Sequence, residues 1–174
     1  MRLNICLAAL AASVAVASPA FAQTVTASAQ AEARGLVLQP LTLTKVDDLD
    51  FGTVISTAAA GDVTIDEDTG NRVVTGGVLP GPANGNRALF SGAGTAGQQV
   101  DLTLTPPVGN LLYSGTNTIN ISNFTMDGGV GLTDSRVING SGTFDVGVGG
   151  TFDIAANQTA GVYAADFDLT AEYQ

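Results

Sequence analysis

The sequence predicts an all-β fold, specifically an immunoglobulin-like antiparallel β-sandwich of roughly ten short strands. Apolar and polar residues alternate with a period of two along several segments, which is typical of strands with one buried face. Turn-forming residues recur about every 8–12 positions, and 22 of the 174 residues are glycine. Threonine and valine are common, whereas clusters of helix-favouring residues are few.

Residues 1–22 are predicted to be a secretory signal peptide. Arg2 precedes an apolar run from Ile5 to Ala17, and Ala20-Phe21-Ala22 supplies a small-x-small cleavage pattern. The run is too short to remain as a membrane span. We therefore expect a chain that begins at Gln23 and passes through the periplasm to the cell surface or the extracellular medium, without membrane insertion.

Residues 23–35 are predicted to be an N-terminal extension ahead of a single β-sandwich domain at 36–174. Every second position is apolar between residues 25 and 33, and no glycine or proline interrupts the pattern. These apolar residues are Val25, Ala27, Ala29, Ala31 and Ala33. Alternation favours a strand, but alanine favours a helix, so a donor strand, a short helix and an unstructured linker all remain open.

The first strands of the domain are expected within residues 36–55. Pro40 interrupts the first alternation, which marks an edge strand or a crossover between sheets. The alternating positions are Leu36, Leu38, Leu41 and Leu43 in the first segment, and Leu49, Phe51, Thr53 and Ile55 in the second. Asp47, Asp48 and Asp50 fit an acidic turn and an exposed strand face.

A hairpin is predicted next, with Val63 and Ile65 pairing with Val73 across the turn from Asp66 to Asn71. The acidic residues Asp66, Glu67 and Asp68 make this turn the best candidate for a calcium loop, because clustered oxygen ligands suit Ca²⁺. It lacks the ligand spacing of helix-loop-helix calcium sites. An ordinary turn explains the composition, and calcium binding is left open.

The middle of the chain contains two clear strands and one irregularity. Ala88 and Phe90 begin one strand, and a second runs through 99–105 until Pro106-Pro107. The apolar phase set by Ile119 and Ile121 changes at Phe124 and Met126. This change predicts a β-bulge near Ser122-Asn123.

Two further strands are expected in a hairpin near the C-terminus. The tetrapeptide at 143–146, Thr-Phe-Asp-Val, recurs as Thr-Phe-Asp-Ile at 151–154, on either side of a glycine-rich stretch. We interpret the two copies as the arms of one hairpin.

The last strand is predicted over Gly161–Gln174, where two residue sets separate cleanly. Tyr163, Ala165, Phe167, Leu169, Ala171 and Tyr173 form the apolar set. Asp166 and Asp168 lie on the opposite, wet face, so we interpret them as solubilising residues rather than a catalytic pair.

The composition argues against an enzyme. The chain has no histidine, and its single cysteine, Cys6, lies in the predicted signal peptide. Nucleophile–histidine pairs and imidazole metal sites are therefore absent from the sequence. No catalytic residue, cofactor or metal is predicted. The formal net charge of −10 also makes nucleic acid an unsuitable partner.

Several segments resemble a bacterial secreted family known only as domain of unknown function four-four-zero-two. The matching segments are Pro40–Lys45, Leu49–Gly52, Gly76–Val78, Val148–Phe152, Gly161–Tyr163 and Phe167…Tyr173. The resemblance spans nearly all of residues 36–174 in order. It implies a fold more than an activity, because the family has no settled function.

A weaker resemblance, to subunits of chaperone-usher pili and related coat proteins, rests on Gly161 and the penultimate Tyr173. It implies a secreted structural subunit of a surface appendage, assembled by β-strand addition with copies of itself, with other pilin-like subunits and with a periplasmic chaperone. Assembly would use the alternating residues 25–33 together with Gly161, Tyr163, Phe167, Leu169 and Tyr173. The alternative function is a monomeric surface or periplasmic binding module without enzymatic activity.

Overall fold

The computed structural model describes residues 26–129 and 131–174, and Val37–Gln174 forms one compact unit. Residues 26–35 are exposed and form neither the strand nor the helix that their sequence allows. The predicted signal peptide, residues 1–22, lies outside the described residues. Among the described residues, no helix is long and apolar enough to cross a membrane.

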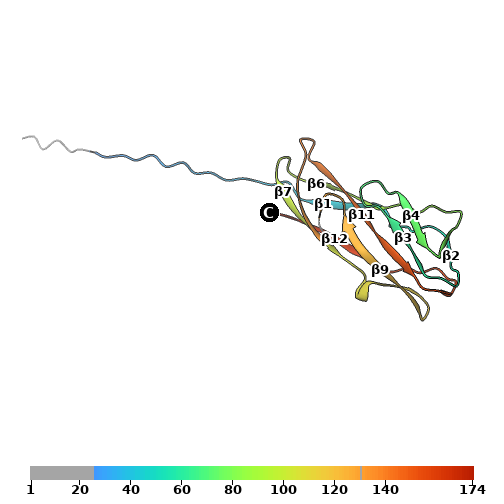
Figure 1. The fold of residues 1–174 in the computed structure, drawn as a ribbon. Helices are drawn as coiled ribbons and strands as arrows, with labels where there is room; N and C mark the ends of the chain where they lie inside the picture. Colours follow the sequence, from blue (N-terminus) through green and yellow to red (C-terminus); the bar gives the residue numbers. More distant parts are fainter. Residues whose placement is uncertain (1–25, 130) are drawn as a thin grey trace, which may run out of the picture. The chain divides into compact units, whose positions relative to one another are not determined.

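The compact unit is all-β, as predicted, and its strands pair antiparallel (Figure 1). The strands are β1 (Thr42–Asp47), β2 (Val54–Ile55), β3 (Gly61–Ile65), β4 (Arg72–Gly76), β5 (Leu79–Pro80), β6 (Ala88–Ala93), β7 (Gln99–Thr105), β8 (Leu111–Ser114), β9 (Asn117–Met126), β10 (Thr133–Val137), β11 (Thr143–Ile154) and β12 (Asp168–Tyr173). A single 3-10 turn, η1 (Val108–Asn110), connects β7 to β8 within the described chain.

Three sheets share these strands. The largest has seven strands and follows the order β1-β6-β11-β3-β4, with β9 paired to β11 and β8 paired to β9. The second has the order β10-β7-β12, and the third is the short pair β2-β5. Thus β1 and β12 each lie at the end of a sheet, while β11 runs through the middle of the unit (Figure 1).

The buried apolar residues of the two larger sheets form one core cluster. Strand β7 contributes Val100, Leu102 and Leu104, each at most 1% exposed, while its intervening residues are more exposed. The seven-stranded sheet contributes fully buried residues from four strands, namely Val63, Ile65, Ala88, Met126, Val146 and Val148. The predicted alternation in 99–105 is therefore confirmed, and it gives β7 one buried face.

The predicted hairpin between residues 143–146 and 151–154 is wrong. Both copies of the repeat lie in one continuous strand, β11, and all residues from Val146 to Phe152 are buried. An even spacing of eight residues keeps Phe144 and Phe152 on one face of a straight strand. The intervening glycines serve close packing, since a Cβ on Gly149 would lie 2.3 Å from the carbonyl oxygen of Ile65.

Two local predictions are confirmed. Strands β3 and β4 form the expected hairpin, although Val74 faces Val63 and Val73 is 54% exposed, one residue out of the predicted register. The register between β9 and β11 shifts between Gly149 and Thr151, where two residues of β9 oppose one of β11. Asn123 lies in this bulge with a φ of 47°.

Three predicted strands are shorter than expected. Leu36 and Leu38 precede β1, which begins only after Pro40, where an amide donor is missing. The alternation of 49–55 breaks at Gly52, whose φ is 74°, so that only Val54–Ile55 form a strand. The last strand is confined to β12, because residues 161–167 turn away to contact β8 instead.

Candidate functional site

The structure contains a groove with a volume of about 1040 Å³. One wall is formed by residues 48–56, which follow β1, and the other by residues 158–167, which precede β12. We call this feature the groove. The groove lies between the segment that follows β1 and the segment that precedes β12, and each of these two strands lies at the end of its sheet.

The floor of the groove is apolar. Phe51 and Phe152 stack with their ring centroids 5.1 Å apart and an interplanar angle of 14°. The remaining floor residues come from four strands and are Phe90, Leu112, Ile119 and Ile154. Each of these six side chains is at most 8% exposed, so the floor is the edge of the hydrophobic core.

The wall formed by 158–167 is held in place by a few specific contacts. Ala164 exchanges two backbone hydrogen bonds with Tyr113 of β8, at 3.0 and 3.1 Å. A Cβ on Gly161 would lie 2.3 Å from the hydroxyl oxygen of Ser114, so glycine permits the close approach to β8. Phe167 packs edge-to-face on Phe124 at 5.0 Å and on Phe90 at 6.0 Å.

Tyr163 stabilises the same wall from within. Its hydroxyl donates to the carbonyl of Thr159 at 2.7 Å and accepts from the Gln158 side chain at 2.9 Å. Apart from Gln158 and Ala164, no residue in 158–167 forms a backbone–backbone hydrogen bond within the described chain. This wall therefore presents backbone donors and acceptors that another strand could pair with.

The opposite wall is tied to the loop at 81–86. The Thr53 amide donates to Ala83 at 3.0 Å, the Thr53 carbonyl accepts from Gly81 at 2.8 Å, and Asp50 pairs with Asn86 in both directions. Ser56 lines the groove, and its buried hydroxyl has no hydrogen-bond partner among the described residues. An unpaired buried hydroxyl is costly unless another group completes its hydrogen bonding.

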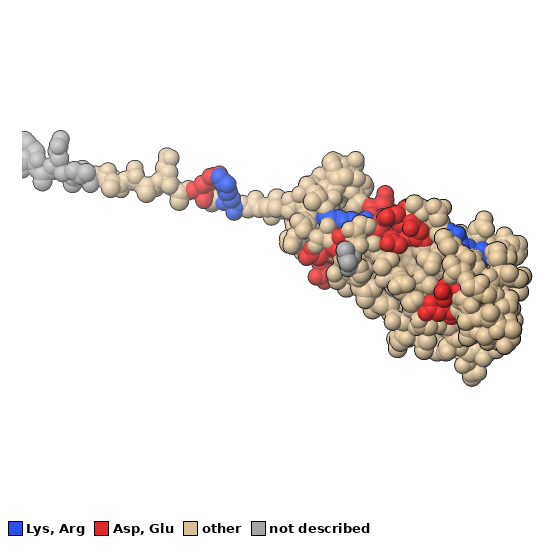
Figure 2. All heavy atoms as spheres, in the orientation of Figure 1, with Lys and Arg blue, Asp and Glu red and all other residues tan. Residues whose placement is uncertain are grey.

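Charges lie at the rim of the groove rather than on its floor. Lys45 and Asp48 form an exposed ion pair at 2.5 Å, and Asp50 and Asp166 also line the groove. Figure 2 shows acidic groups separated by wide uncharged surface on the face that it presents. Exposed pairs of this kind contribute little to stability.

The structure places the predicted assembly residues in different environments. Val25 lies outside the described residues, and Ala27, Ala29, Ala31 and Ala33 are exposed. Gly161, Tyr163 and Phe167 line the groove. Leu169 and Tyr173 lie beyond it in β12, where Leu169 faces Leu104 of β7.

The sequence analysis missed the wall at 48–56. Its acidic residues fit a turn, and its alternation fits a strand, so neither signal indicated a groove. The positive φ angles of Gly52 and Gly85 are what bend this wall, and a Cβ on Gly85 would lie 2.1 Å from the Asp50 carbonyl oxygen. Two glycines far apart in the sequence are too weak a signal to find such a site from sequence.

The candidate calcium loop is a hydrogen-bonded turn. One carboxylate oxygen of Asp66 accepts from the Thr69 amide at 2.7 Å and the Thr69 hydroxyl at 2.6 Å. These bonds from Thr69 lower the pKa of Asp66 below its usual value. Within the described ranges, no three His, Cys, Asp or Glu residues lie together in a metal-binding arrangement.

Comparison with known proteins places the chain in a family. The family described as Domain of unknown function (DUF4402) matches residues 41–173, which is most of the chain and nearly all of the compact unit. Nothing among the curated proteins or the solved structures matches it. The protein belongs to the DUF4402 family.

Proposed function

We propose that the protein is a secreted structural subunit of a bacterial surface appendage or coat, which assembles by β-strand addition. In this proposal, the extension of one copy enters the groove of the next copy. In this view the two larger sheets form an immunoglobulin-like sandwich that lacks one strand. The missing strand would lie between residues 48–56, which follow β1, and residues 158–167, which precede β12. A second copy supplies that strand.

The observation that carries the proposal is the groove itself. It combines an apolar floor, a wall with unpaired backbone groups and an unpartnered hydroxyl at Ser56. Unpaired backbone groups along a strand edge favour association with another chain. In β-strand addition, backbone hydrogen bonds supply affinity, and alternate side chains supply specificity.

The extension has properties of a suitable occupant. Within its described part, residues 26–35 are exposed and form no strand or helix, so they have no internal pairing to give up. Ala27, Ala29, Ala31 and Ala33 would face the floor, while the residues between them would face solvent. Glu32 and Arg34 are the charged residues of the extension, and both would lie on that solvent-facing side near the charged rim.

The small alanine side chains limit the strength of this interaction. Each methylene that is absent from a buried face forfeits about 0.8 kcal/mol of burial. We therefore expect an assembly that depends more on backbone pairing than on deep side-chain pockets.

Deletion of residues 24–34 tests the proposal. The truncated chain keeps the compact unit Val37–Gln174, so it should fold as a monomer that cannot assemble by itself. A synthetic peptide covering residues 24–35 should then bind it, and a peptide with Ala29 replaced by Asp should not. Filaments formed by the truncated chain would contradict the donor role of the extension.

The native assembly can be tested on sheared cell-surface material. On a denaturing gel, an unboiled sample should give a ladder that collapses to a single band on boiling, because strand exchange is kinetically locked. A single band in both lanes would indicate a subunit that does not polymerise.

A monomeric surface or periplasmic binding module is the second candidate function. It is favoured by a second pocket, with a volume of about 650 Å³, which lies beside Arg72 and is lined by other residues than the groove. A truncated and a full-length chain that are both monomeric would support this function over assembly.

A further inference from the structure

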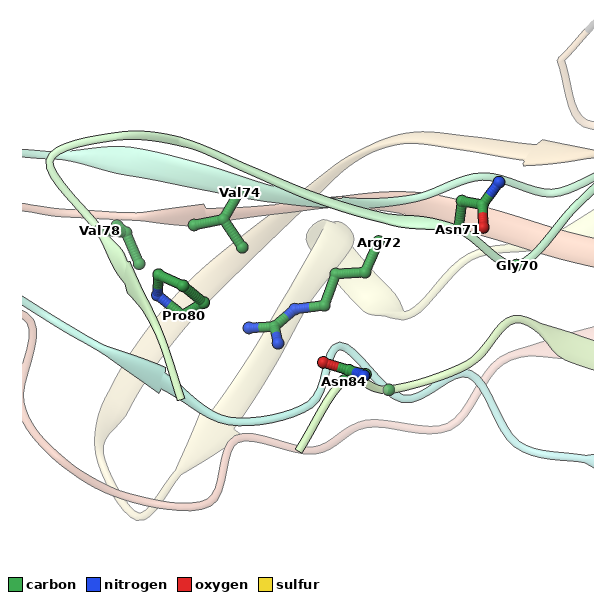
Figure 3. A pocket seen from close by; sticks show the side chains of 8 residues that line it. Gly70, Asn71, Arg72, Val74, Val78, Pro80 and Asn84 are labelled. Carbon is green, nitrogen blue, oxygen red and sulfur yellow. The ribbon is translucent and has the colours of Figure 1, made fainter. Parts of the chain in front are cut away.

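We infer that the pocket beside Arg72 binds a carboxylated sugar. The pocket lies between β4, the β3–β4 turn and the segment 78–85 (Figure 3). Its lining residues differ from those of the groove. Its lining residues are Gly70, Asn71, Arg72, Val74, Val78, Pro80, Asn84 and Gly85. This inference does not depend on whether the subunit assembles.

The first argument is the charge of Arg72. Its guanidinium donates to the carbonyl of Ala83 at 2.8 Å and to the carbonyl of Thr53 at 2.7 Å. Both partners are neutral, and none of the ion pairs in the described part of the chain includes Arg72. The buried Nε–H also has no partner among the described residues. A half-buried cation without a counter-ion favours an incoming anion.

The second argument is the shape of the guanidinium. Arginine presents a planar fork of donors that matches a carboxylate, and this fork remains charged at all physiological pH values. The two carbonyls that it contacts fix its orientation before any ligand arrives. The protein as a whole carries a formal net charge of −10. An anion would therefore bind where a cation is locally uncompensated rather than by general attraction.

The third argument concerns the remaining walls. Figure 3 shows the Arg72 guanidinium between Asn84 on one side and Pro80 on the other, with Val74 and Val78 near Pro80. The Asn84 amide offers both a donor and an acceptor, and it forms no hydrogen bond within the described chain, unlike the Asn86 amide. An amide opposite an apolar patch suits a ring that carries hydroxyls on one side and C–H groups on another.

The loop that carries Asn84 is held in place without a ligand. Gly85 has a φ of 75°, and backbone hydrogen bonds connect Ala83 and Gly81 to Thr53. Because the pocket is largely formed in advance, binding requires little ordering of the chain. A single sugar acid is expected to bind with a Kd of about 1 mM, which is typical for a ligand of that size.

The test uses the full chain and ligand-observed saturation-transfer NMR, which detects binding to monomers and assemblies alike. The probes are glucuronic acid, its methyl ester and glucose. Glucuronic acid should give a saturable signal, whereas the ester and glucose should bind at least fivefold more weakly, because each lacks the negative charge. Equal signals from all three probes, or none from glucuronic acid, would overturn the inference.

Variants then locate the binding site. Arg72→Met and Asn84→Ala should each weaken glucuronate binding, with a loss of tenfold or more for Arg72→Met and about threefold for Asn84→Ala. Arg87→Met is the matched control, because Arg87 also donates to backbone carbonyls, those of Glu67 and Asp68, but does not line the pocket. If Arg72→Met fails to fold, the Asn84→Ala variant still tests the inference, because Asn84 is exposed. An unchanged affinity of this variant for glucuronate would contradict the inference.

Discussion

The hydroxyl of Tyr173 donates a hydrogen bond to the carbonyl oxygen of Gln39 at a distance of 2.8 Å. The two residues are 134 positions apart, so this bond joins the end of β12 to the start of the compact unit. The same hydroxyl accepts from the Thr95 amide at 2.7 Å. The Tyr173 hydroxyl therefore connects three segments, namely β12, the residues before β1 and the loop between β6 and β7.

We predict that Tyr173→Phe lowers the free energy of unfolding by about 1–2 kcal/mol, because two backbone groups lose a partner. Urea denaturation of the purified chain measures this change. Tyr113→Phe is the control, since the Tyr113 hydroxyl makes no hydrogen bond in the described chain and the residue is 46% exposed. Its effect should stay within about 0.5 kcal/mol. Equal losses of stability from both substitutions would contradict a stabilising role for the two hydrogen bonds of the Tyr173 hydroxyl.

Arg136 joins β10 to the larger sheet. Its guanidinium lies 2.6 Å from the Asp127 carboxylate and 2.7 Å from that of Asp134, and all three side chains are less than a quarter exposed. It also donates to the carbonyls of Asp127 and Asp145. The two carboxylates and the hydrogen bonds they accept raise the pKa of Arg136, against the effect of its burial.

Arg136→Met should lower the free energy of unfolding by about 2–3 kcal/mol, because it leaves two carboxylates partly buried without a counter-ion. The exposed pair between Arg34 and Glu32 provides the control, and Arg34→Met should change stability by less than about 0.5 kcal/mol. Thermal unfolding followed by circular dichroism compares the two. Similar effects of both variants would mean that Arg136 does not connect the sheets.

The sequence predicts the strands of this protein better than their ends. Period-two patterns such as 99–105 correspond to β7, because a strand with one buried face imposes that pattern along its whole length. The groove was only partly predictable. Gly161, Tyr163 and Phe167 line it, but the wall at 48–56 depends on backbone bends at Gly52 and Gly85 that no residue pattern specifies.

The incorrect prediction of a hairpin within residues 143–154 also arises from glycines whose role depends on the tertiary structure. Glycines at 147, 149 and 150 look like a turn, yet they lie inside β11. Their role depends on which backbone crosses them, and that partner is distant in sequence. Local chemistry cannot distinguish a glycine that makes a turn from one that admits a neighbour.

Gly149→Ala tests this interpretation of β11. Its Cβ would meet the carbonyl oxygen of Ile65 at 2.3 Å, and a backbone atom cannot rotate away, so we expect a loss of at least about 2–3 kcal/mol or a failure to fold. Gly140→Ala is the matched control, since no atom lies within 4 Å of its added methyl group. That variant should be neutral or slightly stabilised. Soluble yield and urea midpoints separate the outcomes, and a fully stable Gly149→Ala chain would contradict the close packing.

Asp66 makes stability depend on pH. Its pKa is lowered in the folded protein by bonds from Thr69, relative to about 3.9 in an unfolded chain. The ionised carboxylate therefore contributes its stabilisation above about pH 4, and the contribution is lost as the pH falls through the folded-state pKa. Urea unfolding of the parent and of Asp66→Asn should differ at pH 6 and converge at acidic pH. A difference that stays constant across this range would rule out the titration of Asp66 as its cause.

Alternation in the extension is the sharpest test of strand addition. If Ala29 faces the floor of the groove, Ala29→Val adds two buried carbons, and their burial should strengthen peptide binding by about 1–1.5 kcal/mol, or roughly tenfold. Ser28→Val adds similar apolar area on the solvent-facing side and should leave binding unchanged. Both peptides, covering residues 24–35, would be titrated into the chain that lacks residues 24–34, with binding followed by calorimetry. Equal gains from both substitutions would indicate nonspecific hydrophobic contact, because only a strand in a fixed register distinguishes neighbouring positions.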